Sequence, residues 1–167
     1  MKYMQLNPGQ RNTYLESLAG MPVFLENFLS GLSQESILLN GPGGEFSPVE
    51  QVWHLADLED EGFYQRIQAL LDGEAVSLPD FDGDRIARER NYKSLSVSAG
   101  LEKFRAARSR NIDIFRDLDT ADWLQAGYLE GVGPITLCDM PSFLYQHDAA
   151  HRSEIEKWQL HTPGTTR

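Results

Sequence analysis

Apolar residues recur at helical spacing in four long segments of the chain, and strand-like alternation is almost absent. Such a pattern predicts an all-α fold, a four-helix bundle in which each helix buries one apolar stripe. No repeat or change in composition divides the chain, so we predict a single domain over residues 1–167 with its core at about 11–160. The predicted helices run from about Arg11 to Leu32, from Ser47 to Asp72, from Ser96 or Ser98 to about Asp119, and from Thr136 to about Leu160.

Two of these helices carry clear start signals. Ser47-Pro48-Val49-Glu50 combines an N-cap serine, a proline at the first helical position and a glutamate three residues after the cap. Thr136-Leu137-Cys138-Asp139 resembles the same capping box with Asp in place of Glu. Stop signals are also present: Asp72-Gly73 should end the second helix, and Thr162-Pro163-Gly164 the fourth. Gly20-Met21-Pro22 should break or kink the first helix.

The connections between the helices differ in length and character. Residues 72–95 show no clear periodicity, which predicts a long crossover between the second and third helices. Within the crossover, the run Asp80-Phe81-Asp82-Gly83-Asp84 is typical of a loop, and the segment from Arg85 to Tyr92 fits either a short helix or irregular structure. Paired glycines between two short apolar runs in the segment from Gly127 to Ile135 predict a short β-hairpin before the last helix.

Charge and composition exclude several classes of function. The chain has 15 Lys and Arg residues against 25 Asp and Glu residues, a formal charge of −10, and its basic residues form no tract, so nucleic acid is excluded as a partner. No segment approaches the roughly 18 apolar residues of a membrane helix, which excludes a membrane-spanning protein. A single cysteine, Cys138, allows no internal disulfide, so the expected location is the reducing cytoplasm.

Two consecutive turns of the apolar stripe on the fourth predicted helix are histidine, at His147 and His151. Side chains four residues apart lie one above the other on a helix, so both imidazoles can converge on one cation. The main alternative is a buried pair that is satisfied by hydrogen bonds. Metal binding is favoured because four histidines scattered at random along 167 residues rarely fall four residues apart.

The run His147-Asp148-Ala149-Ala150-His151 differs from the HExxH zinc-peptidase motif only by Asp in place of Glu. The rest of that class is missing, because Glu154 and Lys157 occupy the positions where its long form has glycine and histidine. Peptidase activity is therefore disfavoured. A third ligand must come from an earlier part of the chain.

His54 is the only histidine before His147. On a helix with 100° per residue it lies about 160° from the stripe centred on Ala56, so periodicity alone predicts that His54 is exposed. Leu55 and Leu58 lie on the same side, however, so the helix could also be covered on both faces. The residues alone leave the role of His54 open.

Together these features resemble the DinB/YfiT-like superfamily over about residues 11 to 160. The resemblance rests on the order and spacing of Phe46-Ser47-Pro48-Val49-Glu50, the run from His54 to Glu59, the segment from Gly127 to Ile135, and the run from His147 to His151. Members are four-helix bundles that hold a divalent metal with one histidine of the second helix and two of the fourth. The resemblance therefore implies that His54, His147 and His151 are metal ligands.

Characterised members of that family include transferases that use a metal to add low-molecular-weight thiols such as bacillithiol, glutathione or mycothiol to electrophiles, and a thiol-dependent isomerase. The resemblance thus implies a small-molecule substrate, and thiol transfer is our first hypothesis. Metal-dependent hydrolysis is the second, and a non-catalytic, metal-stabilised binding or stress-response module is the third. Zinc, nickel and ferrous iron all accept imidazole ligands. For an acidic helical bundle of this kind, a homodimer is a possible form of assembly.

Four carboxylates near the histidines have open roles. Asp57 and Glu61 follow His54 by about one and two helical turns, and Glu154 follows His151 by about one turn. These three side chains are either partners of the ligands and proton acceptors, or part of a solvated acidic face. Asp148 follows directly after His147, so we expect it to point away from the metal.

Overall fold

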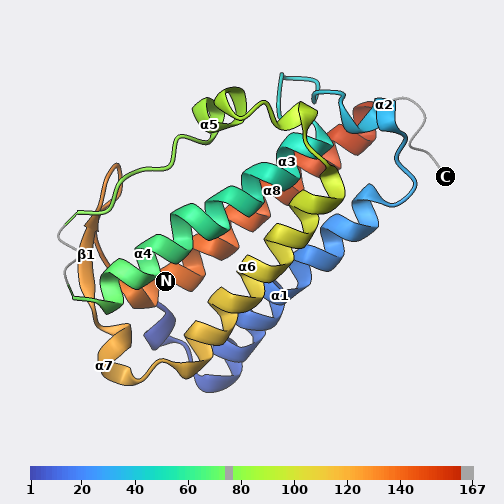
Figure 1. Ribbon diagram of the computed structural model, residues 1–167. Helices are drawn as coiled ribbons and strands as arrows, with labels where there is room; N and C mark the ends of the chain where they lie inside the picture. The colour runs from blue at the N-terminus through green and yellow to red at the C-terminus, as the bar shows by residue number, and fades with distance from the viewer. Residues whose placement is uncertain (74–76, 163–167) are drawn as a thin grey trace.

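Four long helices pack side by side along their length, as Figure 1 shows for the computed structural model, which describes residues 1–73 and 77–162. The second of them is continuous but contains a six-residue π-helical segment, η2. The bounds are α1 (Pro8–Leu29), α3 (Pro48–Asp57) continued by η2 (Leu58–Phe63) and α4 (Tyr64–Leu71), α6 (Val97–Asp117) and α8 (Met140–His161). The predicted all-α four-helix bundle is confirmed.

Shorter elements connect the long helices. A hairpin of β1 (Ala126–Leu129) and β2 (Gly133–Thr136) pairs Leu129 with Gly133 and precedes α8, as predicted. The crossover reaches this hairpin through a bridge from Leu78 to Leu129. The remaining short elements are η1 (Tyr3–Gln5), α2 (Gln34–Ile37), α5 (Gly83–Glu89), η3 (Tyr92–Ser94), α7 (Thr120–Trp123) and η4 (Leu137–Asp139).

Both predicted start signals form. The Glu50 carboxylate accepts hydrogen bonds from the backbone N–H and the hydroxyl of Ser47, at 2.8 and 2.7 Å. The Asp139 carboxylate accepts from the same two groups of Thr136, at 2.8 and 3.1 Å. Gly73, with φ of 70°, follows the end of α4 as predicted. The predicted stop at Pro163 and Gly164 lies outside the described residues.

The expected break in the first helix is not found, because α1 continues through Pro22. A proline has no N–H, so the carbonyl four residues earlier, that of Leu18, loses its helical partner. Arg108 on α6 supplies the replacement by donating to the Leu18 carbonyl oxygen at 2.9 Å. A residue distant in sequence thus satisfies the group that the proline leaves unpaired.

The crossover carries the chain back to the beginning of α3, where the Trp53 indole donates to the Ser96 carbonyl oxygen at 3.0 Å. Because Ser96 is the N-cap of α6, α3 and α6 start at the same end of the bundle. α8 starts at the other end, beside the hairpin (Figure 1). This arrangement places the middle of α8 opposite the C-terminal half of α3, where the histidines meet.

Two apolar clusters fill the bundle, one toward the hairpin and one toward α2. Between them lies a buried polar layer of Arg108, Glu59, Asp148 and Asn111, none of them more than 4% exposed. The histidines lie at the same level of the bundle, because His147 adjoins Asp148 in α8. In the described part of the chain, no helix is long and apolar enough to cross a lipid bilayer.

Candidate metal centre

Three imidazole rings meet between α3 and α8. His54 Nε2 lies 3.3 Å from His147 Nε2, and His151 Nε2 lies 3.0 Å from the same atom. One nitrogen from each ring can be chosen so that all three lie within 4.8 Å of one another. The structure thus brings together the three histidines that the sequence analysis singled out, from two separate parts of the chain.

His54 is buried, with 8% of its surface exposed, so the prediction from periodicity was wrong. The reason is that α3 is covered on both faces. One face packs against α6, and the rings of His147 and His151 and the start of α5 cover the other. The apolar stripe predicts only the face that packs against α6. The face that contacts His147, His151 and α5 is covered by polar side chains and backbone, which leave no apolar pattern.

The distances from His147 Nε2 to the other two Nε2 atoms fit a divalent ion. Two imidazole nitrogens bound to one ion at 2.0–2.1 Å are about 3.3 Å apart at a tetrahedral angle and about 2.9 Å apart at a right angle. The separations of 3.3 Å for His54 and 3.0 Å for His151 match these values. In addition, among the residues that the structure describes, the buried Nδ1 of His54 has no hydrogen-bond partner. Three neutral nitrogen donors suit zinc, nickel or ferrous iron.

A chain of hydrogen bonds fixes the orientation of His151. An ionised carboxylate only accepts, so Glu154 must accept from the Gln51 Nε2 amide group, at 2.7 Å. The Gln51 Oε1 is then left to accept from His151 Nδ1, at 2.6 Å. With its proton on Nδ1, His151 presents the lone pair of Nε2 to the other two rings. Gln51 was not predicted; its position one turn before His54 was the only signal available.

Burial keeps the His54 and His147 rings uncharged. Desolvation, with a further contribution from the neighbouring His151, lowers the pKa of His54 to about 3. The same causes, in the same order, lower the pKa of His147 to about 2. Both rings are therefore neutral at physiological pH, and their nitrogen lone pairs are available to a metal.

These pKa values predict an acid-sensitive fold when no metal is bound. Below pH 6.5 the unfolded histidines bind protons, whereas folded His54 and His147 stay neutral, so stability falls as the pH falls. Between about pH 7 and pH 5.5 each of the two should lower the free energy of unfolding by about 1 kcal/mol. Urea unfolding in the presence of a chelator measures this difference. In the His147→Asn variant this decrease in the free energy of unfolding should be smaller than in the parent, and in the His161→Asn variant it should equal that of the parent. A decrease in His147→Asn as large as that in the parent would contradict the account.

The structure gives separate roles to the four carboxylates whose roles the sequence left open. Glu154 contacts His151, which agrees with the prediction that it is a partner of a metal ligand. Asp57 is 1% exposed and accepts hydrogen bonds of 2.6 Å from each of three side chains, those of Arg90, Tyr92 and Lys103. Asp57 therefore anchors the crossover to the bundle and is not at the metal centre.

Glu61 forms a two-point ion pair with Arg90, which strengthens the same anchor. Asp148 points away from the three rings, as expected from its place after His147, and binds Arg108. Two of the four open carboxylates thus stabilise the crossover, one belongs to the polar layer, and only Glu154 touches the metal centre.

The crossover also contributes a close contact that sequence reasoning missed. A β-carbon built on Gly83 would lie 2.4 Å from Cε1 and 2.5 Å from Nδ1 of His54. Only glycine allows the backbone to approach the ring so closely. The sequence analysis recognised the loop-like run from Asp80 to Asp84, which contains this glycine, but it did not predict that Gly83 contacts His54.

Replacing Gly83 by alanine should therefore weaken metal binding by tilting His54. We expect the affinity for zinc to fall by about tenfold or more, the effect usual for a residue that orients a ligand. The Gly20→Ala variant is the control, because its added methyl group would meet nothing nearer than 4.0 Å. Competition with a chromophoric chelator measures both affinities. Equal affinity in the two variants would show that Gly83 does not constrain His54.

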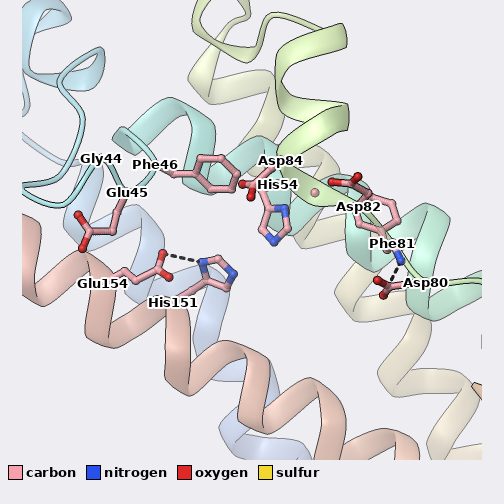
Figure 2. Close-up of a pocket in the computed structure, with 11 residues that line it drawn as sticks. Gly44, Glu45, Phe46, His54, Asp80, Phe81, Asp82, Asp84, His151 and Glu154 are labelled. Atoms are coloured by element: carbon pink, nitrogen blue, oxygen red, sulfur yellow. Dashed lines mark hydrogen bonds and ion pairs between the residues drawn. The ribbon is translucent and has the colours of Figure 1, made fainter. Parts of the chain in front are cut away.

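A cavity of about 480 Å³ opens beside the histidines. Figure 2 shows His54 and His151 facing one another across it, with Phe46 and Phe81 on either side of His54. The His54 ring centroid lies 5.2 Å from that of Phe46 and 6.3 Å from that of Phe81. Glu154 and four further carboxylates, Glu45, Asp80, Asp82 and Asp84, complete much of the wall. A small molecule can therefore reach the nitrogens.

Comparison with known proteins agrees with this picture. The sequence profile described as the DinB superfamily matches residues 21–155. The solved structure of YfiT from Bacillus subtilis matches with a TM-score of 0.84. That protein is described as a probable metal-dependent hydrolase with an unusual four-helix bundle topology. The match covers 93% of this chain and 89% of that chain at 18% sequence identity, so it supports the fold alone. No curated protein matches the sequence at a significant level.

Proposed function

This chain belongs to the DinB superfamily, and from that premise we propose that His54, His147 and His151 hold one divalent metal ion in an enzyme active site. The proposed reaction is the transfer of a low-molecular-weight thiol to an electrophilic small molecule. The observation that carries the proposal is the convergence of three Nε2 atoms, two of which belong to His54 and His151 in the wall of a cavity that a small molecule can enter.

Three protein ligands, rather than four, are typical of a catalytic metal site. When bound, such an ion lowers the pKa of a thiol or a water molecule that it contacts, and so supplies a nucleophile at neutral pH. The protein contributes three imidazoles, of which His151 is held in the required tautomer by Gln51. Phe46 and Phe81 form apolar walls that limit the access of water to His54.

In the proposed transfer, the thiolate sulfur forms a bond to the electrophilic carbon, and the leaving group departs with its electron pair. The proton of the thiol passes to solvent through the open side of the cavity. Glu154 is suited to holding His151 in place rather than to storing this proton. Its contact with the His151 ring, reinforced by the hydrogen bond from Gln51, lowers the pKa of the Glu154 carboxyl.

Metal-dependent hydrolysis is the second candidate, and the description of YfiT as a probable metal-dependent hydrolase favours it. A hydrolase needs a nearby base that takes the proton of an attacking water molecule. Glu154 is the carboxylate that touches the metal centre, and its lowered pKa makes it a weak base. We rank thiol transfer first because the family that the sequence resembles includes metal-dependent thiol transferases. Thiol transfer also fits the cytoplasm, the expected location, where such thiols are abundant.

The test is the metal-dependent consumption of a thiol by a model electrophile. Zinc-, nickel- and iron-loaded protein is incubated with 1-chloro-2,4-dinitrobenzene and each of several cellular thiols, and product formation is compared with that of the chelator-treated protein. We expect thiol conjugation that is lost on chelation and in the His151→Ala variant. Hydrolysis of ester substrates without thiol conjugation would favour the second candidate. A large fall in melting temperature on chelation, with no turnover of either kind, would indicate a metal-stabilised binding module.

A further inference from the structure

The cavity beside the histidines has a strongly one-sided charge. Five of the residues that line it are carboxylates, whereas no lysine or arginine lines it within the described ranges. Three of these acids, Asp80, Asp82 and Asp84, come from the crossover, and the other two come from the segment before α3 and from α8. Separate parts of the chain therefore place negative charge around one opening.

Nearby cations neutralise only part of this charge. Glu45 pairs with Lys157, and Asp82 lies 3.8 Å from an Arg85 nitrogen. Asp80 interacts electrostatically with the buried Arg66, whose own hydrogen bond goes to the Pro79 carbonyl oxygen. The side chain of Asp84 shows no hydrogen bond or ion pair with any residue that the structure describes. An excess of negative charge thus remains at the opening.

Two features independent of the acids indicate that the cavity receives a ligand. His54, which is more than nine-tenths buried, projects into it (Figure 2). The Nδ1 of this ring has no partner in the described structure and lies against Gly83, another residue of the cavity wall. Phe46 and Phe81 present phenyl rings on both sides of His54. Aromatic faces attract cations, so these walls suit the same kind of molecule as the carboxylates do.

We propose that this cavity selects a substrate that carries a positive charge, such as an ammonium group, and disfavours anionic substrates. This inference rests on the proposed function and narrows its substrate class. The reacting atom of the substrate lies at the histidines, and the rest of the molecule extends toward Asp80 and Asp84. An amine-bearing thiol therefore meets attraction where a carboxylate-bearing thiol meets repulsion.

The experiment compares three small thiols that differ in charge. Cysteamine is a cation, 2-mercaptoethanol is neutral, and 3-mercaptopropionate is an anion. Each is titrated into cobalt-loaded protein, in which a bound thiolate produces an absorption band. The same titrations use a variant with Asp80→Asn and Asp84→Asn, in which the amide can still accept the hydrogen bond that Asp80 accepts from Phe81. The two proteins are compared through the ratio of the cysteamine and mercaptopropionate affinities, because the intrinsic acidity of each thiol then cancels.

We expect this ratio to be about tenfold higher in the parent than in the variant, since each exposed carboxylate contributes a modest attraction or repulsion. The difference should shrink at high salt. The Asp113→Asn variant, changed on α6 outside the cavity, should keep the parent's ratio. An unchanged ratio in the Asp80 and Asp84 variant would overturn the inference and leave the metal site intact.

Failure to bind cobalt would instead overturn the proposed function. The charge preference would still be tested, because ethylammonium and propionate can be titrated into the metal-free protein and followed by the amide NMR shifts of Gly83 and Asp84. Larger shifts with ethylammonium, reduced in the Asp80 and Asp84 variant, support the inference. Equal shifts, or larger shifts with propionate, contradict it.

Discussion

Replacing Arg108 by methionine should lower the free energy of unfolding by about 3–5 kcal/mol, because it leaves two buried carboxylates without their counter-charge. Arg108 is 1% exposed and forms a two-point contact with Asp148, at 2.6 and 2.9 Å. Its Nη2 also donates to Glu59, at 2.9 Å. Neither carboxylate can reach water when the guanidinium is removed.

The same substitution removes the donor that satisfies the Leu18 carbonyl, the group left unpaired by Pro22. Arg108 therefore joins α6 to α1, to the π-helical segment and to α8 at one level of the bundle. Asn111 contributes to this layer, with hydrogen bonds of 2.9 and 3.1 Å to the side chain and the carbonyl oxygen of Glu59. Loss of Arg108 thus disturbs all the long helices at once.

Urea unfolding at neutral pH in the presence of a chelator measures the effect without a contribution from metal. The matched control is Arg105→Met on the same helix, whose ion pair with Glu26 has side chains 48% and 58% exposed. Exposed pairs contribute little, so this control should cost less than about 1 kcal/mol. A similar small cost for Arg108→Met would refute the structural role of the polar layer.

Replacing His147 by alanine should weaken zinc binding by at least about 100-fold, more than the 10- to 100-fold usual for a residue that only orients a ligand. Its Nε2 is the atom that lies 3.3 Å from His54 and 3.0 Å from His151, so its loss leaves two nitrogens with no third donor beside them. Competition with a chromophoric chelator gives both affinities.

The control is His161→Ala, which removes an exposed histidine from the last residue of the same helix. Within the described part of the chain, His161 interacts only with its own helix, through the Lys157 carbonyl oxygen. We expect its variant to bind zinc as the parent does. If His147→Ala kept the parent's affinity while it remained folded, the three-histidine site would be wrong.

Local signals in the sequence predicted much of the fold. The caps at Ser47 and Thr136 and the hairpin glycines depend on residues within a few positions of one another, and each formed as expected. Pro22 failed as a predictor because its compensation comes from Arg108, in a different helix. No local pattern records a partner that is so distant in sequence.

The sequence also predicted part of the candidate site. The spacing of His147 and His151 on one helix pointed to their convergence, whereas the burial of His54 depends on the crossover and on α8, which periodicity does not describe. The resemblance to the family supplied His54. Gln51 and Gly83 were missed because their roles consist of one hydrogen bond and one steric contact, and both exist only in the folded chain.

The claim that three imidazoles surround one ion is tested most directly by X-ray absorption spectroscopy of protein purified without added metal, combined with elemental analysis. We predict one divalent ion per chain, with three imidazole nitrogens at about 2.0–2.1 Å. The ion should be lost from His147→Ala and kept in His161→Ala. Protein that retains no metal after exposure to zinc, nickel and ferrous iron, or an ion bound through sulfur or through carboxylates alone, would contradict the account.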